Sequence, residues 1–399
     1  MTPEQREALD LQASGLTRAQ IGEKLGITAS GVKARLERAR ESMRADPSIS
    51  DAAAAGGIED VSVLSHFWKI VKDENGNGYS LFVKNDQSRI SLSDMVRDGI
   101  KAALETPPTF EPRPQAGGDH LLVVDLADLH FLKLCRSTET GYEYNSEVAA
   151  HRVIEGTKRL LQSAKGFGVG RILFVLGNDL LHVDGAKNTT TSGTPQDTSD
   201  QIFGGYRAAM AALRHAIEAC AEVADVDLVH CMSNHDWVTG WALAQSLGAV
   251  FENHPNVHSS AYSLSEIHRK YYRYGANLFG LTHGDGAKEE KLYGLMVKEA
   301  RQHISECQNL YWMLHHVHHK IRARRGVDVF QSEKDHTGMT AHVFGSAQPE
   351  GGHVNIEYVR SPSPPDGWHD RNGFVNRQGV ECFLFHGHDG QRARFTEWF

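Results

Sequence analysis

The sequence predicts a layered α/β fold for most of the chain, preceded by a small all-helical module and a short connector that contains β-strands. From Leu121 onward, short apolar runs alternate with amphipathic helical stretches, which is typical of a sheet covered by helices. Residues 1–45 place their apolar side chains at helical spacing. Between these parts, an Asn-Gly pair separates two alternating runs. We therefore expect three domains, at residues 1–45, 58–105 and 119–399.

Composition limits the function classes that need to be considered. A chain of 399 residues is too long for one ordinary domain. Its net charge of −8 gives no general basic field, so any contact with nucleic acid requires a local patch. The N-terminus is polar and no run is apolar enough to span a membrane, so we expect a cytoplasmic protein without membrane contact. The 23 histidines, many beside Asp or Asn, indicate metal or phosphate chemistry.

The N-terminal module reads as three short helices. Thr2-Pro3 can start the first, and turns at Gly15 and Gly26 separate it from helices at Arg18–Leu25 and Ala29–Ser42. The pattern GLTRAQIGEKLGITASGVKARLERARE resembles the helix-turn-helix of sigma-factor and response-regulator DNA-binding domains, in which the second helix lies in the major groove. The candidate DNA-binding residues on that helix are Lys33, Arg35, Arg38 and Arg40. A helical interaction or dimerisation module is the alternative.

The middle of the chain reads as a hairpin between two linkers. The linkers are the Ala/Gly-rich stretch at 51–57 and the Pro-rich stretch at 106–118. Between them, VSVLSHFWKIVK and YSLFVKN alternate apolar and polar residues on either side of DENGNG, which predicts a hairpin. A helix is expected from about Leu92 to Leu104, and the connector 58–105 carries no chemistry that we can identify.

Five polar clusters follow apolar runs in the larger part, each where a predicted strand ends. They are Asp128-Leu129-His130, Gly177-Asn178-Asp179 with His182, Asn234-His235-Asp236, His283-Gly284-Asp285, and His315-His316-Val317-His318. Because the carboxyl ends of parallel strands meet at one edge of a sheet, these side chains are expected to gather. Imidazole, carboxylate and amide oxygen together are typical metal ligands.

The order of these motifs resembles the calcineurin-like metallophosphoesterases, whose signature is D-x-H, G-D, N-H-D/E, H and G-H-x-H. The resemblance covers about residues 121–320 and implies a β-sandwich flanked by helices. It is nearest to the DNA double-strand-break-repair exonuclease branch, whose Gly-Asp-x-x-His motif is matched from Asp179 to His182. Two departures are the insertion of Asn178 after the glycine and the replacement of the last glycine by His315.

The resemblance implies a role for each matching residue. The first metal would be held by Asp128, His130, Asp179 and His318, and the second by Asp179 as a bridge, Asn234, His283 and His316. His235 and His182 would contact the phosphate or the leaving group, with Asp236 orienting His235. Two divalent ions about 3.5–4 Å apart can share a hydroxide and clamp the phosphate oxygens. This ligand set favours Mn, with Fe, Zn, Co or Ni as alternatives.

These observations predict a dinuclear metal-dependent phosphodiesterase, with a nuclease directed to DNA as the leading hypothesis. The alternatives are a phosphomonoesterase, a cyclic-nucleotide or small-molecule phosphodiesterase, and a DNA-binding regulator with a degenerate phosphoesterase domain. The family branch also implies a homodimer. We expect His315 and His319 beside the site, and Asp125 in its strand without a ligand role. A mobile loop is expected at 184–200, and the basic run from Lys320 to Arg325 either steers nucleic acid or forms a solvated strand face.

Overall fold

The computed structural model describes residues 3–13, 15–45, 66–72, 78–84, 91–108, 117–316, 354–374 and 376–399. The chain forms two compact units, Met1–Ser91 and Leu92–Phe399, and each is described by itself. Among the helices of the described ranges, none combines the length and the apolar character needed to cross a membrane.

The first unit begins with the three expected helices, α1 (Pro3–Ala13), α2 (Arg18–Leu25) and α3 (Ala29–Ala45). The side chain of Thr17 and that of Gln20 cap each other's backbone at the start of α2, and Gly26 ends the helix with φ of 64°. The three helices enclose a small core formed by Ala8, Ile21, Val32 and Leu36. The helix boundaries expected from turn and capping residues are thereby confirmed to within three residues.

Two antiparallel strands, β1 (His66–Lys72) and β2 (Gly78–Lys84), form the expected hairpin in the same unit. The helix expected after it is present as α5 (Leu92–Glu105). However, α5 contacts α8 (Ile202–Ala221) and α9 (Trp237–Val250) of the second unit. The sequence pattern places this helix with the connector. In the structure it belongs to the larger unit, because its buried face packs against helices of that unit.

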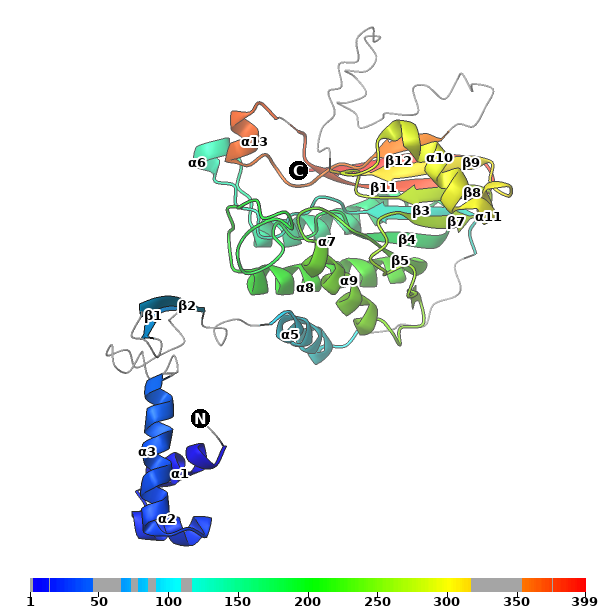
Figure 1. Cartoon of the computed structure of the whole chain (residues 1–399). Coiled ribbons are helices and arrows are strands. Elements are labelled where there is room, and N and C mark those ends of the chain that lie inside the picture. Colours follow the sequence, from blue (N-terminus) through cyan, green and yellow to red (C-terminus); the bar gives the residue numbers. More distant parts are fainter. Residues whose placement is uncertain are drawn as a thin grey trace. The chain divides into compact units, whose positions relative to one another are not determined.

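The second unit contains a six-stranded and a four-stranded sheet (Figure 1). In spatial order the larger sheet consists of β12 (Gly390–Trp398), β11 (Gly379–His386), β3 (His120–Asp125), β4 (Val169–Gly177), β5 (Asp225–Cys231) and β6 (Val257–His258). The smaller sheet consists of β10 (Asn355–Tyr358), β9 (Asn309–Leu314), β8 (Asn277–Leu281) and β7 (Lys270–Tyr274). Strands β3 to β6 are parallel, as are β8 to β10.

The two sheets face each other across a shared apolar core. Alternate residues of β3 divide between two clusters: Leu121 and Val123 join the core between the sheets, whereas Leu122 and Val124 face the helices. Phe279 of β8 and Met313 of β9 enter the inter-sheet core from the opposite side. The fold is thus mixed α/β with two mixed sheets, as the strand–helix alternation predicts.

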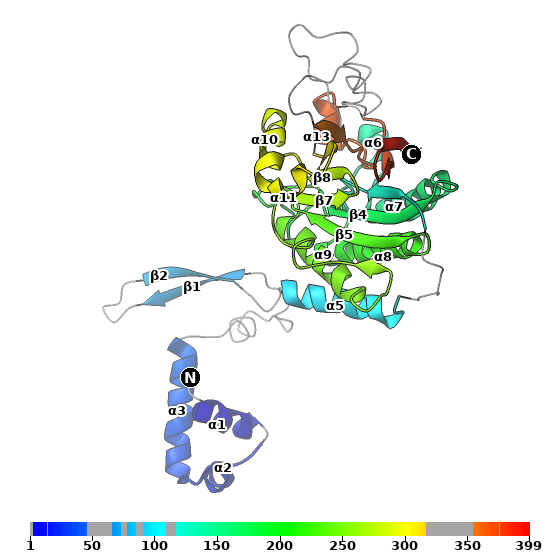
Figure 2. The same ribbon diagram turned by 90° about the vertical axis from the view of Figure 1, so that its right-hand side faces the viewer.

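Helices cover the outer faces of both sheets (Figure 1). On the larger sheet these are α7 (Ser146–Ser163), α8 and α9, and the core between them and the sheet is the largest of the molecule's described part. On the smaller sheet, α10 (Glu289–Glu299) and α11 (Arg301–Ile304) pack their apolar side against Leu278 and Trp312. Two short helices, α6 (Ser137–Thr140) and α13 (Gly367–Arg371), lie side by side near one end of the sheets (Figure 2).

Candidate metal centre

All five polar motifs follow the carboxyl ends of strands, namely β3, β4, β5, β8 and β9. Five of their residues have left-handed backbone conformations: Asp128 (φ 50°), His130 (46°), Asn178 (56°), Asp179 (61°) and His316 (67°). Such conformations cost about 1–3 kcal/mol each and are concentrated at functional sites. Hydrogen bonds between the first two motifs hold this backbone, because Asp128 N donates to Asn178 O (2.7 Å) and His130 N to Asp179 O (2.9 Å).

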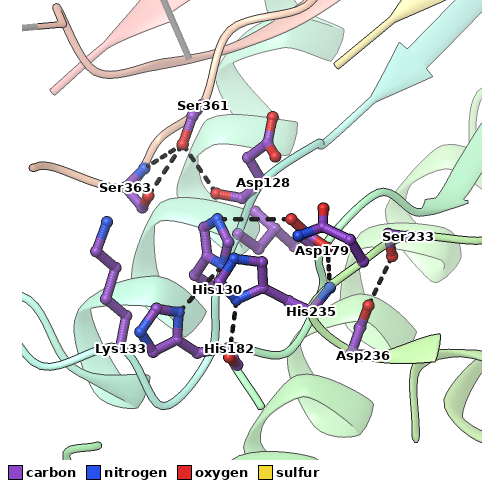
Figure 3. A network of polar contacts seen from close by, with 12 residues as sticks. Asp128, His130, Lys133, Asp179, His182, Ser233, His235, Asp236, Ser361 and Ser363 are labelled. Carbon is purple, nitrogen blue, oxygen red and sulfur yellow. Dashed lines mark hydrogen bonds and ion pairs between the residues drawn. The ribbon is translucent and has the colours of Figure 1, made fainter. Parts of the chain in front are cut away.

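Asp179 lies at the centre of the clustered side chains (Figure 3). Its carboxylate belongs to two groups of potential metal ligands whose donor atoms lie within 4.8 Å of one another. One group adds Asp128 and His130, and the other adds His283 and His316. Five of the seven predicted ligands are thus brought together as two sets that share Asp179.

Asn234 lies beside the second set. Its Oδ1 lies 2.8 Å from His283 Nε2, which in turn lies 3.2 Å from Asp179 Oδ2. His283 and Asp179 are almost fully buried, whereas His316 is exposed. Three donor atoms from strands of both sheets therefore converge within contact distance. The remaining predicted ligand, His318, lies outside the described residues, as do His319 and the basic run from Lys320 to Arg325.

Hydrogen bonds to neighbouring motifs hold His235 in place and leave its Nε2 as the second ring nitrogen. Its Nδ1 donates to the carbonyl of His182 (2.9 Å), and its amide donates to Asp179 Oδ1 (3.0 Å). The first bond fixes the tautomer, so that Nε2 carries the lone pair. The rings of His130, His182 and His235 lie together (Figure 3), and His182 stacks on His235 at 5.2 Å.

Asp236 has other partners than the one expected. Its carboxylate accepts from Ser233 Oγ (2.6 Å) and from Leu181 N (2.8 Å). It therefore joins the β5 motif to the segment that carries His182, while the His182 carbonyl orients His235. The difference arises because the chain turns into α9 directly after Asp236, which is the residue preceding that helix.

The buried acids and the imidazole beside them have displaced pKa values. Burial raises the pKa of Asp128 to about 7, and burial together with the Asp179 charge raises that of Asp236 to about 7. Burial alone would raise the pKa of Asp179, but His283 and His235 hold it well below its usual range. Burial would lower the pKa of His283, but Asp179 raises it to about 9.

Two further imidazoles have lowered pKa values. Burial lowers the pKa of His182 well below its usual value, and partial desolvation together with the neighbouring His283 lowers that of His316. Neutral imidazole is the form that binds a metal or accepts a proton. A donor set of carboxylate, amide and imidazole fits divalent transition-metal ions.

Buried hydrogen bonds around His315 hold the strand ends that carry this centre. His315, which replaces the expected glycine, is fully buried, and its Nε2 lies 3.0 Å from both carboxylate oxygens of Asp125. Its Nδ1 donates to Thr282 O (3.1 Å), and the amide of the inserted Asn178 lies 3.3 Å from Nε2. The two departures from the family pattern thus contact each other and link strand ends of the two sheets.

Some residues that shape the site carry no sequence signal. Ser361 Oγ donates to the carbonyl of Asp128 (2.9 Å) although the two lie 233 positions apart (Figure 3). The loop 184–200, expected to be mobile, is held by specific bonds. Asp184 Oδ1 accepts from Val238 N and Thr239 N at the start of α9 (2.9 and 2.8 Å), and Thr191 N donates to Asn234 O (3.3 Å). This loop is therefore part of the wall of the site.

In the first unit, the candidate DNA-binding residues lie on α3. Lys33 and Arg38 are exposed and Arg35 is half-buried, while Val32 and Leu36 on the same helix fill the core. Lys33 is 3.8 Å from Glu37 in an exposed pair, which contributes little to stability and leaves the lysine accessible. The backbone of Arg40 belongs to α3 as expected.

Comparison with known families bears on the first unit. Residues 1–43 match the model of the family described as sigma-70, region 4. The N-terminus thus carries a sigma-70 region 4 domain, consistent with a helix-turn-helix module that interacts with DNA. No curated protein matches the chain.

Proposed function

We propose that this protein is a dinuclear metal-dependent phosphodiesterase of the calcineurin-like type, directed to DNA by its N-terminal module. The observation that carries the proposal is the position of Asp179 in both groups of potential ligands. Two cations held close together require a carboxylate that both can share. The facing sheets with helices on both outer sides agree with the β-sandwich that the sequence motifs imply.

The residues that would hold the metals follow from these groups. Asp128 and His130 would bind one ion, and Asn234, His283 and His316 the other, with Asp179 between them. Such ions, when bound, lower the pKa of water and neutralise charge on the phosphate. Since Asn234 is neutral, the second set keeps its negative charge low and leaves room for an anionic substrate.

The protein's own contribution to bond cleavage would come from His235. Its Nδ1–H is engaged with the His182 carbonyl and orients the ring, so Nε2, once it has taken up a proton, can donate it to the oxygen of the departing group. His182 stacks on its ring and restricts its rotation. A residue in this role is needed most when the leaving oxygen is an alkoxide, as in nucleic acid.

Hydrolysis of two matched aryl esters tests this function. The metal-stripped protein is expected to be inactive towards bis(p-nitrophenyl) phosphate and p-nitrophenyl phosphate. Added Mn²⁺ is expected to restore turnover, with the diester favoured in kcat/KM. Preference for the monoester would instead indicate a phosphatase, and the absence of turnover with any divalent metal would favour a DNA-binding regulator.

The DNA-binding part of the proposal can be tested on the intact chain. Replacing both Lys33 and Arg38 by Ala is expected to weaken retention of duplex DNA at low salt and to reduce its salt dependence, by about one unit of log–log slope per lost phosphate contact. Hydrolysis of the small diester should stay unchanged. Lys101→Ala, an exposed lysine on α5, is the control. Unaltered DNA retention by the double variant would exclude this role for α3.

A further inference from the structure

A cavity of about 510 Å³ opens directly beside the candidate metal centre. One wall contains Asn234, His235 and His182, so a phosphate at the centre would place its ester substituent towards this space. The other walls come from the loop around Thr190–Asp197 and from Trp368 and His369 on α13. Its size lies within the range of small-ligand sites, roughly 300–1,000 Å³.

Trp368 gives this cavity an aromatic wall. Its side chain is 63% exposed, the largest exposed fraction among the large hydrophobic residues of the described part. Phe374 lies nearly parallel behind it, with ring centroids 5.6 Å apart and an interplanar angle of 19°. An exposed indole supported by a second ring is a rigid surface on which a flat group can stack. Stacking would remove the apolar surface of the indole from water, which favours binding.

The short helix that carries Trp368 is held in place by charged contacts. Lys133, itself buried, reaches Asp366 Oδ2 at 3.5 Å. Asp366 in turn accepts from the backbone (3.0 Å) and from Nδ1 (2.7 Å) of His369. Gly367 packs against α6, where an added Cβ would lie 2.1 Å from Glu139 Oε1 and displace that side chain. The position of Trp368 is thus fixed by the fold.

The charges around the cavity restrict what it can bind. Glu139, Asp197 and Asp366 contribute carboxylates to its walls, and the described lining includes no lysine or arginine. A second phosphate, as in a polyphosphate chain, would meet these carboxylates without a cation to balance it. Hydroxyl and amide groups of Thr190, Thr194 and Gln196 offer hydrogen bonds to an uncharged polar group instead.

We infer that this cavity binds an uncharged aromatic substituent of the phosphate ester, of the size of a nucleoside, and that Trp368 selects it by stacking. The inference rests on the proposed function, because the metals would hold the phosphate. It specifies the group held in the cavity as a terminal nucleoside of the phosphodiester, with no second phosphate beyond the one at the metal centre.

Equilibrium binding of two phosphates that differ only in the base tests the inference. The Mn-loaded full-length protein is titrated by calorimetry with adenosine 5′-monophosphate and with ribose 5-phosphate. We expect the nucleotide to bind about tenfold more tightly, the size expected for one stacked base. Trp368→Ala should remove this preference by weakening only the nucleotide, and Trp368→Phe should keep most of it.

Phe167→Ala is the matched control, since Phe167 is also exposed but precedes β4, at the end opposite the metal centre. It should keep the wild-type preference. Equal binding of both ligands by the wild type, or a preference that survives Trp368→Ala, overturns the inference while leaving the metal centre intact. If neither phosphate binds the Mn-loaded protein, the proposed function itself fails.

Discussion

Asp179→Asn is expected to abolish metal binding and diester hydrolysis together. The substitution keeps the size of the side chain but removes the negative charge that two cations would share. Because metal ions supply several kcal/mol of charge stabilisation in the transition state, we expect kcat/KM to fall by about three orders of magnitude or more. Metal content by mass spectrometry and turnover of the aryl diester measure the two effects.

Asp389→Asn provides the control for that substitution. Asp389 lies on the turn between β11 and β12 with half of its side chain exposed, and it belongs to neither ligand group. It should bind metal and turn over substrate like the wild type. An Asp179→Asn protein that remains fully loaded and active would disprove the bridging role.

Replacing His235 by Ala is expected to reduce turnover while the metals remain bound. Loss of an acid that protonates the leaving oxygen typically costs about 10²–10⁴-fold in rate. The loss should be large for a dinucleotide, whose leaving group is an alkoxide, and much smaller for bis(p-nitrophenyl) phosphate, whose leaving group needs no proton. Comparing kcat for these two substrates separates this role from a general loss of structure.

His215→Ala is the control, because His215 is exposed on α8 and its Nδ1 donates only within that helix to Ala211 O. Equal losses for both substrates in the His235 variant would show that His235 does not act on the leaving group. Loss of metal in that variant would instead make His235 a ligand, and its grouping with His130 and His182 shows that the distances permit this.

The sequence predicted the scaffold of this site well, because local patterns determine it. The apolar runs at Leu121, Arg171 and Asn277 became strands β3, β4 and β8, since alternate or continuous apolar residues must be buried on a sheet. The motifs after β3 and β4 then had to lie at the same edge of the larger sheet, and the motif after β8 meets them because the two sheets face each other. The amphipathic stretch after the first motif forms helix α7, whose start is capped by the Asn145 side chain.

The contacts that support the site could not be predicted from the sequence, because they depend on tertiary structure. No local pattern indicates that Ser361 approaches the Asp128 carbonyl or that Lys133 is buried against Asp366. The stretch SPSPPDGWHD reads as a polar loop, yet it supplies Trp368 to the cavity wall. Nor does the insertion of Asn178 indicate that its side-chain amide lies 3.3 Å from His315 Nε2.

The most direct test of the central claim is anomalous diffraction at the manganese edge from crystals of the Mn-loaded protein. The account predicts two peaks on either side of the Asp179 carboxylate, one also contacting Asp128 and His130 and the other His283 and His316. A single peak, or peaks that Asp179 does not touch, would contradict a dinuclear centre bridged by this residue.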